Sequence, residues 1–238
     1  MVNQLPTNIT PTILYPDSDG QPMADNTKQF RWIVIIKENL ELLFANDPDV
    51  FVAGDLLWYP VEGDNKIRQA PDAMVVFGRP KGDRGSYRQW VENGIPPQVV
   101  FEILSPGNRL KEMAKKLRFY ERYGVEEYYV YDPDEVELIG WLRSGEDLEI
   151  IEEMNGWVSP RLEIKFQITS ENLEIFSPSG ERFLSYVELA QLGEQEKQRA
   201  EQERQRADEA MTQLEQERQR YQALEALLRE RGINPEQL

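Results

Sequence analysis

Two acidic residues lie in apolar runs that are otherwise typical of buried strands. Asp72 is in the run QAPDAMVVFG, and Glu102 lies within PPQVVFEILSP. Each run has the roughly four to eight residues expected of a strand in the core of a sheet. A carboxylate is costly to bury unless it is paired or binds a cation. These two positions therefore restrict both the fold and the chemistry of the chain.

Strand geometry indicates how the two carboxylates could meet. Side chains alternate between the faces of a strand, which places Asp72 on the face of Met74. In the same way, Glu102 shares a face with Leu104. If the two strands are neighbours in register, both carboxylates can bind one cation, and the carbonyl oxygen of Ile103 could be a third ligand. Few carboxylates, a carbonyl and several waters are the ligands that Mg²⁺ prefers.

A lysine-bearing helix follows the second run. The segment NRLKEMAKKLRFYERYG predicts a helix from about Asn108, as its cap, to Tyr123, with Gly124 stopping it. Its buried stripe on a helical wheel consists of Leu110, Met113, Leu117 and Tyr120. Lys116 lies at the edge of this stripe, on the flank of Arg109, whereas Lys115 points to solvent.

This geometry singles out Lys116 as a partner of the two carboxylates. A lysine can orient the attacking water or neutralise the charge that develops on a phosphate. We therefore expect Asp72, Glu102 and Lys116 to be the catalytic residues of a phosphodiester-cleaving site. Lys116 could instead be an ordinary surface lysine whose stem lies along the stripe.

Composition excludes several other mechanisms. The chain has no cysteine and no histidine, so thiolate sites, imidazole-based triads and histidine-ligated zinc are excluded. Any metal must be held by oxygen ligands, which favours Mg²⁺, Mn²⁺ or Ca²⁺, and we expect Mg²⁺ or Mn²⁺ as the cofactor. No apolar stretch approaches the roughly 18 residues of a membrane span. The N-terminus has no signal-peptide pattern, and we expect a cytoplasmic protein without membrane contacts.

The net charge of −16 counts against generic nucleic-acid binding, but the charge is unevenly distributed. Between residues 66 and 88 there are six basic and two acidic residues. The expected substrate-binding residues are Lys66, Arg68, Arg79, Lys81, Arg84 and Arg88, together with Ser105 and Arg109. The loop that holds most of the basic residues could equally be a solvated surface loop, and Ser105 could be a helix cap.

The order of elements predicts an α/β (α+β) domain over residues 26–186 with a mixed central sheet flanked by helices. Residues 1–25 are expected to be extended, and a helix is expected to start near residue 26 or 27. A long loop is expected over 78–97. The expected strands lie within residues 47–60, 70–78, 98–104, 125–134, 135–144, 147–153, 161–170 and 172–178.

Residues 187–238 differ from the rest and predict a long, polar C-terminal helix. Residues spaced by seven form one row, which consists of Ala200, Ala207, Leu214, Tyr221 and Leu228. The neighbouring core position is mostly charged, so the heptad pattern is weak before Met211 and better after it. A solvated single helix and a coiled coil that forms a homo-oligomer are about equally compatible with this pattern.

Several of these residues together resemble a known family. Pro71–Asp72, VVFEILSP at 99–106 and GVEEYYVYDP at 124–133 match the Uma-two family of restriction-endonuclease-like proteins, as do four single positions between them. Those positions are Arg109, Glu112, Lys116 and Tyr120. The family belongs to the PD-(D/E)XK nuclease superfamily, and the resemblance covers roughly residues 15–180.

The resemblance implies a restriction-endonuclease-like core that uses Mg²⁺ or Mn²⁺. Asp72 and Glu102 match the two metal carboxylates, and the superfamily's usual lysine position is Leu104 here. In this family the lysine comes from the following helix and matches Lys116. The chain departs from the family at Glu112, which replaces an aspartate, at Pro16, which replaces an acidic residue, and in lacking a histidine of the first helix.

Two functions from different classes are compatible with these observations. The first is a metal-dependent endonuclease acting on nucleic acid, with DNA the favoured substrate. The second is a catalytically silent protein that keeps the nuclease fold and assembles partners through its C-terminal helix. The carboxylates and the lysine favour the first, and the acidic charge and the departures from the family favour the second.

Overall fold

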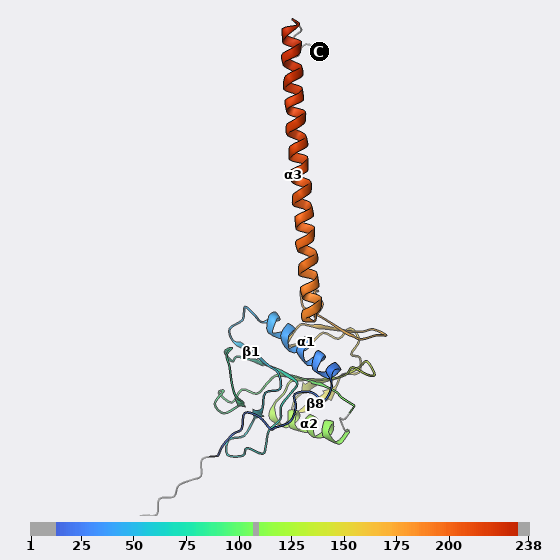
Figure 1. Ribbon diagram of the computed structural model, residues 1–238. Coiled ribbons are helices and arrows are strands. Elements are labelled where there is room, and N and C mark those ends of the chain that lie inside the picture. Colours follow the sequence, from blue (N-terminus) through green and yellow to red (C-terminus); the bar gives the residue numbers. More distant parts are fainter. Residues whose placement is uncertain (1–12, 107–109, 233–238) are drawn as a thin grey trace, which may run out of the picture. The chain divides into compact units, whose positions relative to one another are not determined.

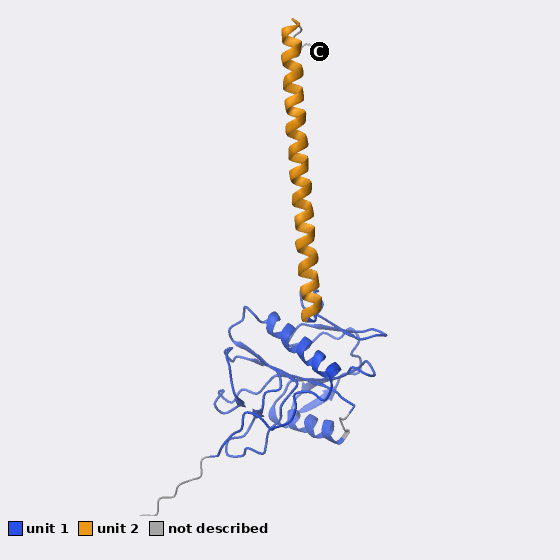
Figure 2. Ribbon diagram, viewed as in Figure 1, with its two compact units in different colours: residues 1–185 blue, residues 186–238 orange. Residues whose placement is uncertain are grey.

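The computed structural model describes residues 13–106 and 110–232 of the chain. It divides into two compact units, one within residues 1–185 and one from Tyr186 onward (Figure 2). The first unit contains the strands and two helices, and the second is a single long helix (Figure 1).

A six-stranded mixed sheet is the centre of the first unit. Its strands follow the order β1-β3-β5-β6-β7-β8 and pair antiparallel, except for the parallel pair β5 and β6. Parallel neighbours need a crossover connection, and a helix supplies it here. The strands are β1 (Val50–Ala53), β3 (Ala73–Phe77), β5 (Val99–Ile103), β6 (Glu127–Asp132), β7 (Glu137–Ser144) and β8 (Asp147–Ile150).

Helices cover both faces of this sheet. The helix α1 (Thr27–Leu43) packs Ile33, Ile36 and Leu40 against one face, and α2 (Leu110–Tyr123) packs Tyr120 against the other (Figure 1). The central strands are therefore buried on both sides, which explains their nearly unbroken apolar sequences. The mixed α/β architecture expected from the sequence is confirmed.

The ends of the helices follow from local chemistry. The Asn26 side chain accepts hydrogen bonds of 2.9 Å from the backbone N–H groups of Lys28 and Gln29 and caps α1. The helix α2 ends before Gly124, whose φ of +94° is a conformation that glycine adopts at little cost. The cap expected at Asn108 lies outside the described residues.

One expected strand and one expected loop are wrong in part. Residues 47–60 do not form a single strand, because the backbone turns after Ala53 and Asp55 adopts a φ of +49°. The chain then forms β2 (Trp58–Tyr59), which pairs in parallel with β4 (Tyr87–Arg88) inside the segment expected to be a loop. Backbone hydrogen bonds thus attach the 78–97 segment to the body.

The remaining strands form a small hairpin. Strands β9 (Lys165–Ile168) and β10 (Leu173–Phe176) pair antiparallel, and Phe166, Leu173 and Ile175 join the core on the α1 face of the main sheet.

The second unit is α3 (Tyr186–Glu230), a helix of 45 residues without a buried side chain. None of the helices that the structure describes has the length and hydrophobicity to cross a bilayer.

Candidate active site

The sheet register brings Asp72 and Glu102 together. In the β3–β5 pair Ala73 lies opposite Phe101, so one further step places Asp72 opposite Glu102. Alternation puts both on the α2 face, and the Asp72 Oδ2 atom accepts a hydrogen bond of 2.6 Å from the Ile103 backbone N–H. Asp72 is 8% exposed and Glu102 is 2% exposed, so both carboxylates are deeply buried.

The helix α2 supplies two donors to Glu102. The Lys116 Nζ atom lies 2.6 Å from Glu102 Oε2, and the Tyr120 hydroxyl donates to Glu102 Oε1. The two donors are four residues apart, so they lie on one face of the helix one turn from each other. Lys115 is exposed, as the helical wheel predicts. The structure therefore places Asp72, Glu102 and Lys116 in one buried cluster.

The electrostatics of the cluster disfavour a second negative charge beside Glu102. Burial and the charge of Glu102 raise the pKa of Asp72 well above its usual range, although Lys116 and the Ile103 N–H group oppose the shift. Burial lowers the pKa of Lys116, but Glu102 and Asp72 outweigh it and raise this pKa overall. Lys116 therefore stays charged, whereas burial beside Glu102 disfavours the ionised form of Asp72.

A third carboxylate, Asp55, lies next to this cluster and was not identified from the sequence. Strand β1 ends at Ala53, which lies opposite Met74, and the turn that follows passes the backbone of Asp72 at Gly54. The Asp55 backbone N–H donates to the Pro71 carbonyl at 3.0 Å. Burial raises the pKa of Asp55, and the charges of Asp19 and Glu102 raise it further. Its position just after the apolar run VFVA is the signal that could have revealed it.

Three other expected site residues have different surroundings. The Ile103 carbonyl, expected as a metal ligand, accepts a hydrogen bond of 2.8 Å from Gln29 Nε2 of α1. The Ser105 hydroxyl donates to Asp25 Oδ2 at 2.6 Å. Arg109 lies outside the described residues. The side chains that bind Glu102 thus come from α2. The side chain that binds the Ile103 carbonyl comes from α1, and the one that binds Ser105 comes from Asp25, just before the cap of α1.

The carboxylate oxygens of this cluster could bind a hydrated divalent cation. Among the described residues, no three acidic side chains lie close enough to hold a metal between them. Mg²⁺ needs fewer, because it keeps several of its waters and binds one or two carboxylates. The Tyr128 hydroxyl lies on the same sheet face, is 1% exposed, and has no hydrogen-bond partner in the described part of the chain. Burial raises the pKa of the Tyr128 hydroxyl most, and the charges of Glu102 and Asp72 raise it further. The hydroxyl is therefore close enough to both carboxyl groups to interact with them electrostatically. A hydrated ion would give this hydroxyl a partner.

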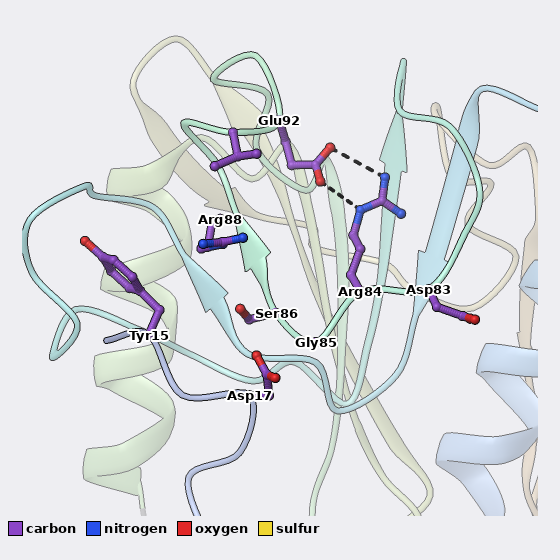
Figure 3. A pocket seen from close by; sticks show the side chains of 9 residues that line it. Tyr15, Asp17, Asp83, Arg84, Gly85, Ser86, Arg88 and Glu92 are labelled. Carbon is purple, nitrogen blue, oxygen red and sulfur yellow. Dashed lines mark hydrogen bonds and ion pairs between the residues drawn. The ribbon is translucent and has the colours of Figure 1, made fainter. Parts of the chain in front are cut away.

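The six basic residues expected to contact substrate fall into two groups. Arg79 and Arg84 bind Glu92, with Nε–Oε distances of 2.7 and 2.8 Å, and Figure 3 shows the contact of Arg84. The Arg84 guanidinium also stacks on the ring of Phe51. Lys81 Nζ donates to the Val50 carbonyl at 3.2 Å, which ties the same segment to β1. The structure gives these three residues contacts that hold the 78–97 segment in place.

The other group is more open to a ligand. Lys66 and Arg88 are exposed, and Arg68 is half-buried and donates to the Asn65 carbonyl at 3.1 Å. Arg88 lines a polar pocket with Tyr15 and Ser86, and Arg84 and Glu92 form its opposite wall (Figure 3). The ring of Tyr15 packs on that of Trp90 at 4.9 Å between centroids, so an aromatic surface borders the pocket.

Comparison with known proteins finds one matching family model and a similar solved structure. A family model described as "Putative restriction endonuclease" matches residues 19–183. A crystal structure of a "putative nuclease belonging to DUF820" from Anabaena variabilis ATCC 29413 is similar, with 17% identity and a TM-score of 0.43 over 57% of this chain and 72% of that chain. No curated protein matches the sequence.

The first unit is thus a restriction-endonuclease-like domain. The family model spans more than half of the chain, and the chain belongs to the Uma2 family. The resemblance seen in the sequence is confirmed.

Proposed function

We propose that this protein is an endonuclease that depends on Mg²⁺ or Mn²⁺ and hydrolyses phosphodiester bonds of nucleic acid, with DNA the favoured substrate. The observation that carries the proposal is the buried cluster of Asp72, Glu102 and Lys116 on the α2 face of the sheet. Such a cluster is expensive to bury, and it holds Asp72 beside a second carboxylate that raises its pKa, so a structural role alone explains it poorly. We place the activity in the cytoplasm, where nucleic acid and Mg²⁺ are both present.

The residues have distinct roles in this proposal. Asp72 and Glu102 would hold the cation, which when bound polarises the phosphate and lowers the pKa of water. Tyr120 fixes the Glu102 carboxylate through its hydroxyl. Lys116 reaches the cluster from α2 and would stabilise negative charge as it develops on the phosphate. Asp55 lies within the field of Glu102 and Lys116 and would favour a cation beside the cluster when it is ionised.

Substrate contacts are proposed for the exposed basic residues Lys66 and Arg88. Phosphate contacts release counterions, so affinity for DNA should fall steeply as salt rises. Lys66→Ala with Arg88→Ala should weaken binding and flatten this salt dependence by about one phosphate contact for each residue removed. Fluorescence anisotropy with a labelled duplex at two salt concentrations measures it. Unchanged affinity and slope would place the binding surface elsewhere.

Cleavage of supercoiled plasmid and of single-stranded DNA, with Mg²⁺ or Mn²⁺ and with EDTA, tests the catalytic proposal. Asp72→Asn and Glu102→Gln should each abolish cleavage. Glu171→Gln changes the charge equally at an exposed hairpin position and should cleave like the parent protein. Activity that survives in Asp72→Asn, or that persists in EDTA, would exclude this site as the catalytic centre.

A catalytically silent assembly protein is the second candidate. The observation that favours it is that both Glu102 oxygens already have protein partners, Lys116 and Tyr120. Isothermal titration with Mn²⁺ separates the two candidates, because a silent fold should release no heat at this site. Binding that disappears in Asp72→Asn supports the nuclease.

A further inference from the structure

The helix α3 contains a sequence repeat that has no role in the first unit. The hexapeptide Glu-Gln-Glu-(Lys/Arg)-Gln-Arg occurs at residues 194–199, 201–206 and 215–220, always in the same seven-residue register. An ideal straight helix drifts by about 20° per heptad relative to such a repeat. A strict repeat therefore keeps one stripe of the helix facing one way only when the helix supercoils around a partner.

The residues spaced by seven along α3 form a stripe that becomes apolar toward the C-terminus. A central row, which we call the α3 row, consists of Ala200, Ala207, Leu214, Tyr221 and Leu228. Apolar side chains along this part of the helix are more than half exposed: Met211, Leu214, Tyr221, Leu224 and Leu227. Exposed large apolar side chains that recur along one helix are typical of an interaction surface.

Charges border the α3 row with opposite sign on its two sides. After two of the five row positions, Ala200 and Leu214, a glutamate follows three residues on (Glu203 and Glu217) and an arginine follows four residues on (Arg204 and Arg218). After the row positions Ala207 and Tyr221, the residues three on are the apolar Ala210 and Leu224. At about 100° per residue, positions three and four residues on lie on opposite sides of the row. At these two row positions, the residues that directly border the row are therefore acidic on one flank and basic on the other.

We propose that α3 pairs with α3 of a second copy of this chain, parallel and in register, through the α3 row. In a parallel pair the two-fold axis runs along the helices, so the acidic flank of one helix lies beside the basic flank of the other on both sides. In an antiparallel pair the two-fold axis crosses the helices, and like flanks meet. Charge complementarity thus selects the parallel pair and a second copy as the partner.

The inference concerns α3 alone and does not rest on the proposed function. The α3 row contains only Ala200 and Ala207 before Leu214, so the apolar contact is concentrated between Leu214 and Leu228. The pair should therefore be weak and concentration-dependent, with the flanking charges adding to it at low salt.

Single cysteines in the full chain give a direct test, because the protein has none of its own. Ala207→Cys places a thiol in the α3 row, where a parallel in-register pair brings it against its own copy. Gln205→Cys lies on the far side of the helix and is the matched control. Under mild oxidation we expect a disulfide-linked dimer for Ala207→Cys, severalfold more than for Gln205→Cys, and sedimentation equilibrium of the parent chain should show dimer.

Two outcomes would overturn the proposal. Ala207→Cys and Leu228→Cys could each stay unlinked alone and link only when mixed, which is the pattern of an antiparallel pair. Alternatively, Ala207→Cys could link no more than Gln205→Cys while the parent chain sediments as monomer, which would make α3 a solvated single helix. As a check on the charges, reversing Glu203 and Glu217 to Lys should weaken the dimer, and exchanging Arg204 and Arg218 for Glu in the same chain should restore it.

Discussion

The Tyr120 hydroxyl is the contact that keeps one Glu102 oxygen satisfied inside the core. Tyr120 is fully buried, and burial followed by the charge of Glu102 raises its pKa well above the usual value, so it remains a donor at neutral pH. Its removal leaves a buried carboxylate oxygen without that donor, and such a loss costs more than the bond itself contributes.

We expect Tyr120→Phe to lower the free energy of unfolding by about 1–3 kcal/mol. Tyr123→Phe, at the end of the same helix and half-buried, is the control and should change it little. Urea unfolding of both variants measures the difference. Equal stability of Tyr120→Phe and the parent protein would mean that the bond to Glu102 contributes nothing to the fold.

Asp55 illustrates a conflict between stability and function at a single residue. Its folded-state pKa is raised, so its ionised form destabilises the folded protein, and this cost grows as the pH rises through that pKa. Asparagine accepts the left-handed φ of +49° as readily as aspartate does.

Asp55→Asn should therefore leave the metal-free protein equally or more stable at neutral pH and should weaken its affinity for Mn²⁺. Thermal unfolding with and without Mn²⁺ measures both effects. A variant that loses stability without metal, or that gains the same stabilisation from Mn²⁺ as the parent, would show that Asp55 has no electrostatic influence on the site.

At the scale of elements, Glu92 organises the 78–97 segment through Arg79 and Arg84. Burial alone would raise the pKa of Glu92, but the bonds from Arg84 and Arg79 outweigh it and lower this pKa. A carboxyl with a lowered pKa stabilises the fold above its unfolded-state pKa, and that contribution is lost as the pH falls through the folded-state value.

Glu92→Gln should reduce stability at pH 7 by on the order of 2 kcal/mol, because two arginines lose a charged acceptor. The difference from the parent protein should shrink as the pH falls below about 4.5. Urea unfolding across this range measures it, with Glu62→Gln as an exposed control. A difference that stays constant with pH would contradict the assignment of the effect to the ion pairs.

At the scale of the whole molecule, the fold was predictable where the spacing of apolar residues matched a single type of secondary structure. The runs of β3, β5 and β6 are apolar on both faces, and α2 has a clear 3.6-residue stripe, so these elements and the meeting of Asp72, Glu102 and Lys116 followed from alternation. In these segments the local conformational preference of the sequence agrees with the secondary structure that the tertiary contacts require.

The remainder depended on contacts between distant residues. The break after Ala53 was not predicted, because the apolar residues on both sides of Gly54 resemble one continuous strand. The backbone of Gly54 lies close to that of Asp72, and an added Cβ would lie 3.3 Å from the Asp72 carbonyl oxygen. Asp55 was missed together with this break, although it follows an apolar run. Arg79 and Arg84 resembled substrate contacts until the fold placed Glu92 between them.

The division into two units leads to a prediction about the whole chain. Since α3 has no buried residue, removing residues 186–238 should leave the thermal unfolding midpoint of residues 1–185 nearly unchanged. Calorimetry of the full chain and the truncated chain at equal concentration measures this. A large fall in the midpoint would show that α3 supports the first unit.

The site residues come from different elements, two carboxylates from neighbouring strands and the lysine from a helix, and this affects how distant mutations change the site. The spacing between Asp72 and Glu102 is set by a ladder of backbone hydrogen bonds, which side-chain changes scarcely alter. The position of Lys116 depends instead on how α2 rests on the sheet through Met113 and Leu117. Evolution can therefore adjust the lysine by repacking under the helix while the carboxylates keep their separation, so the two halves of the site can change independently.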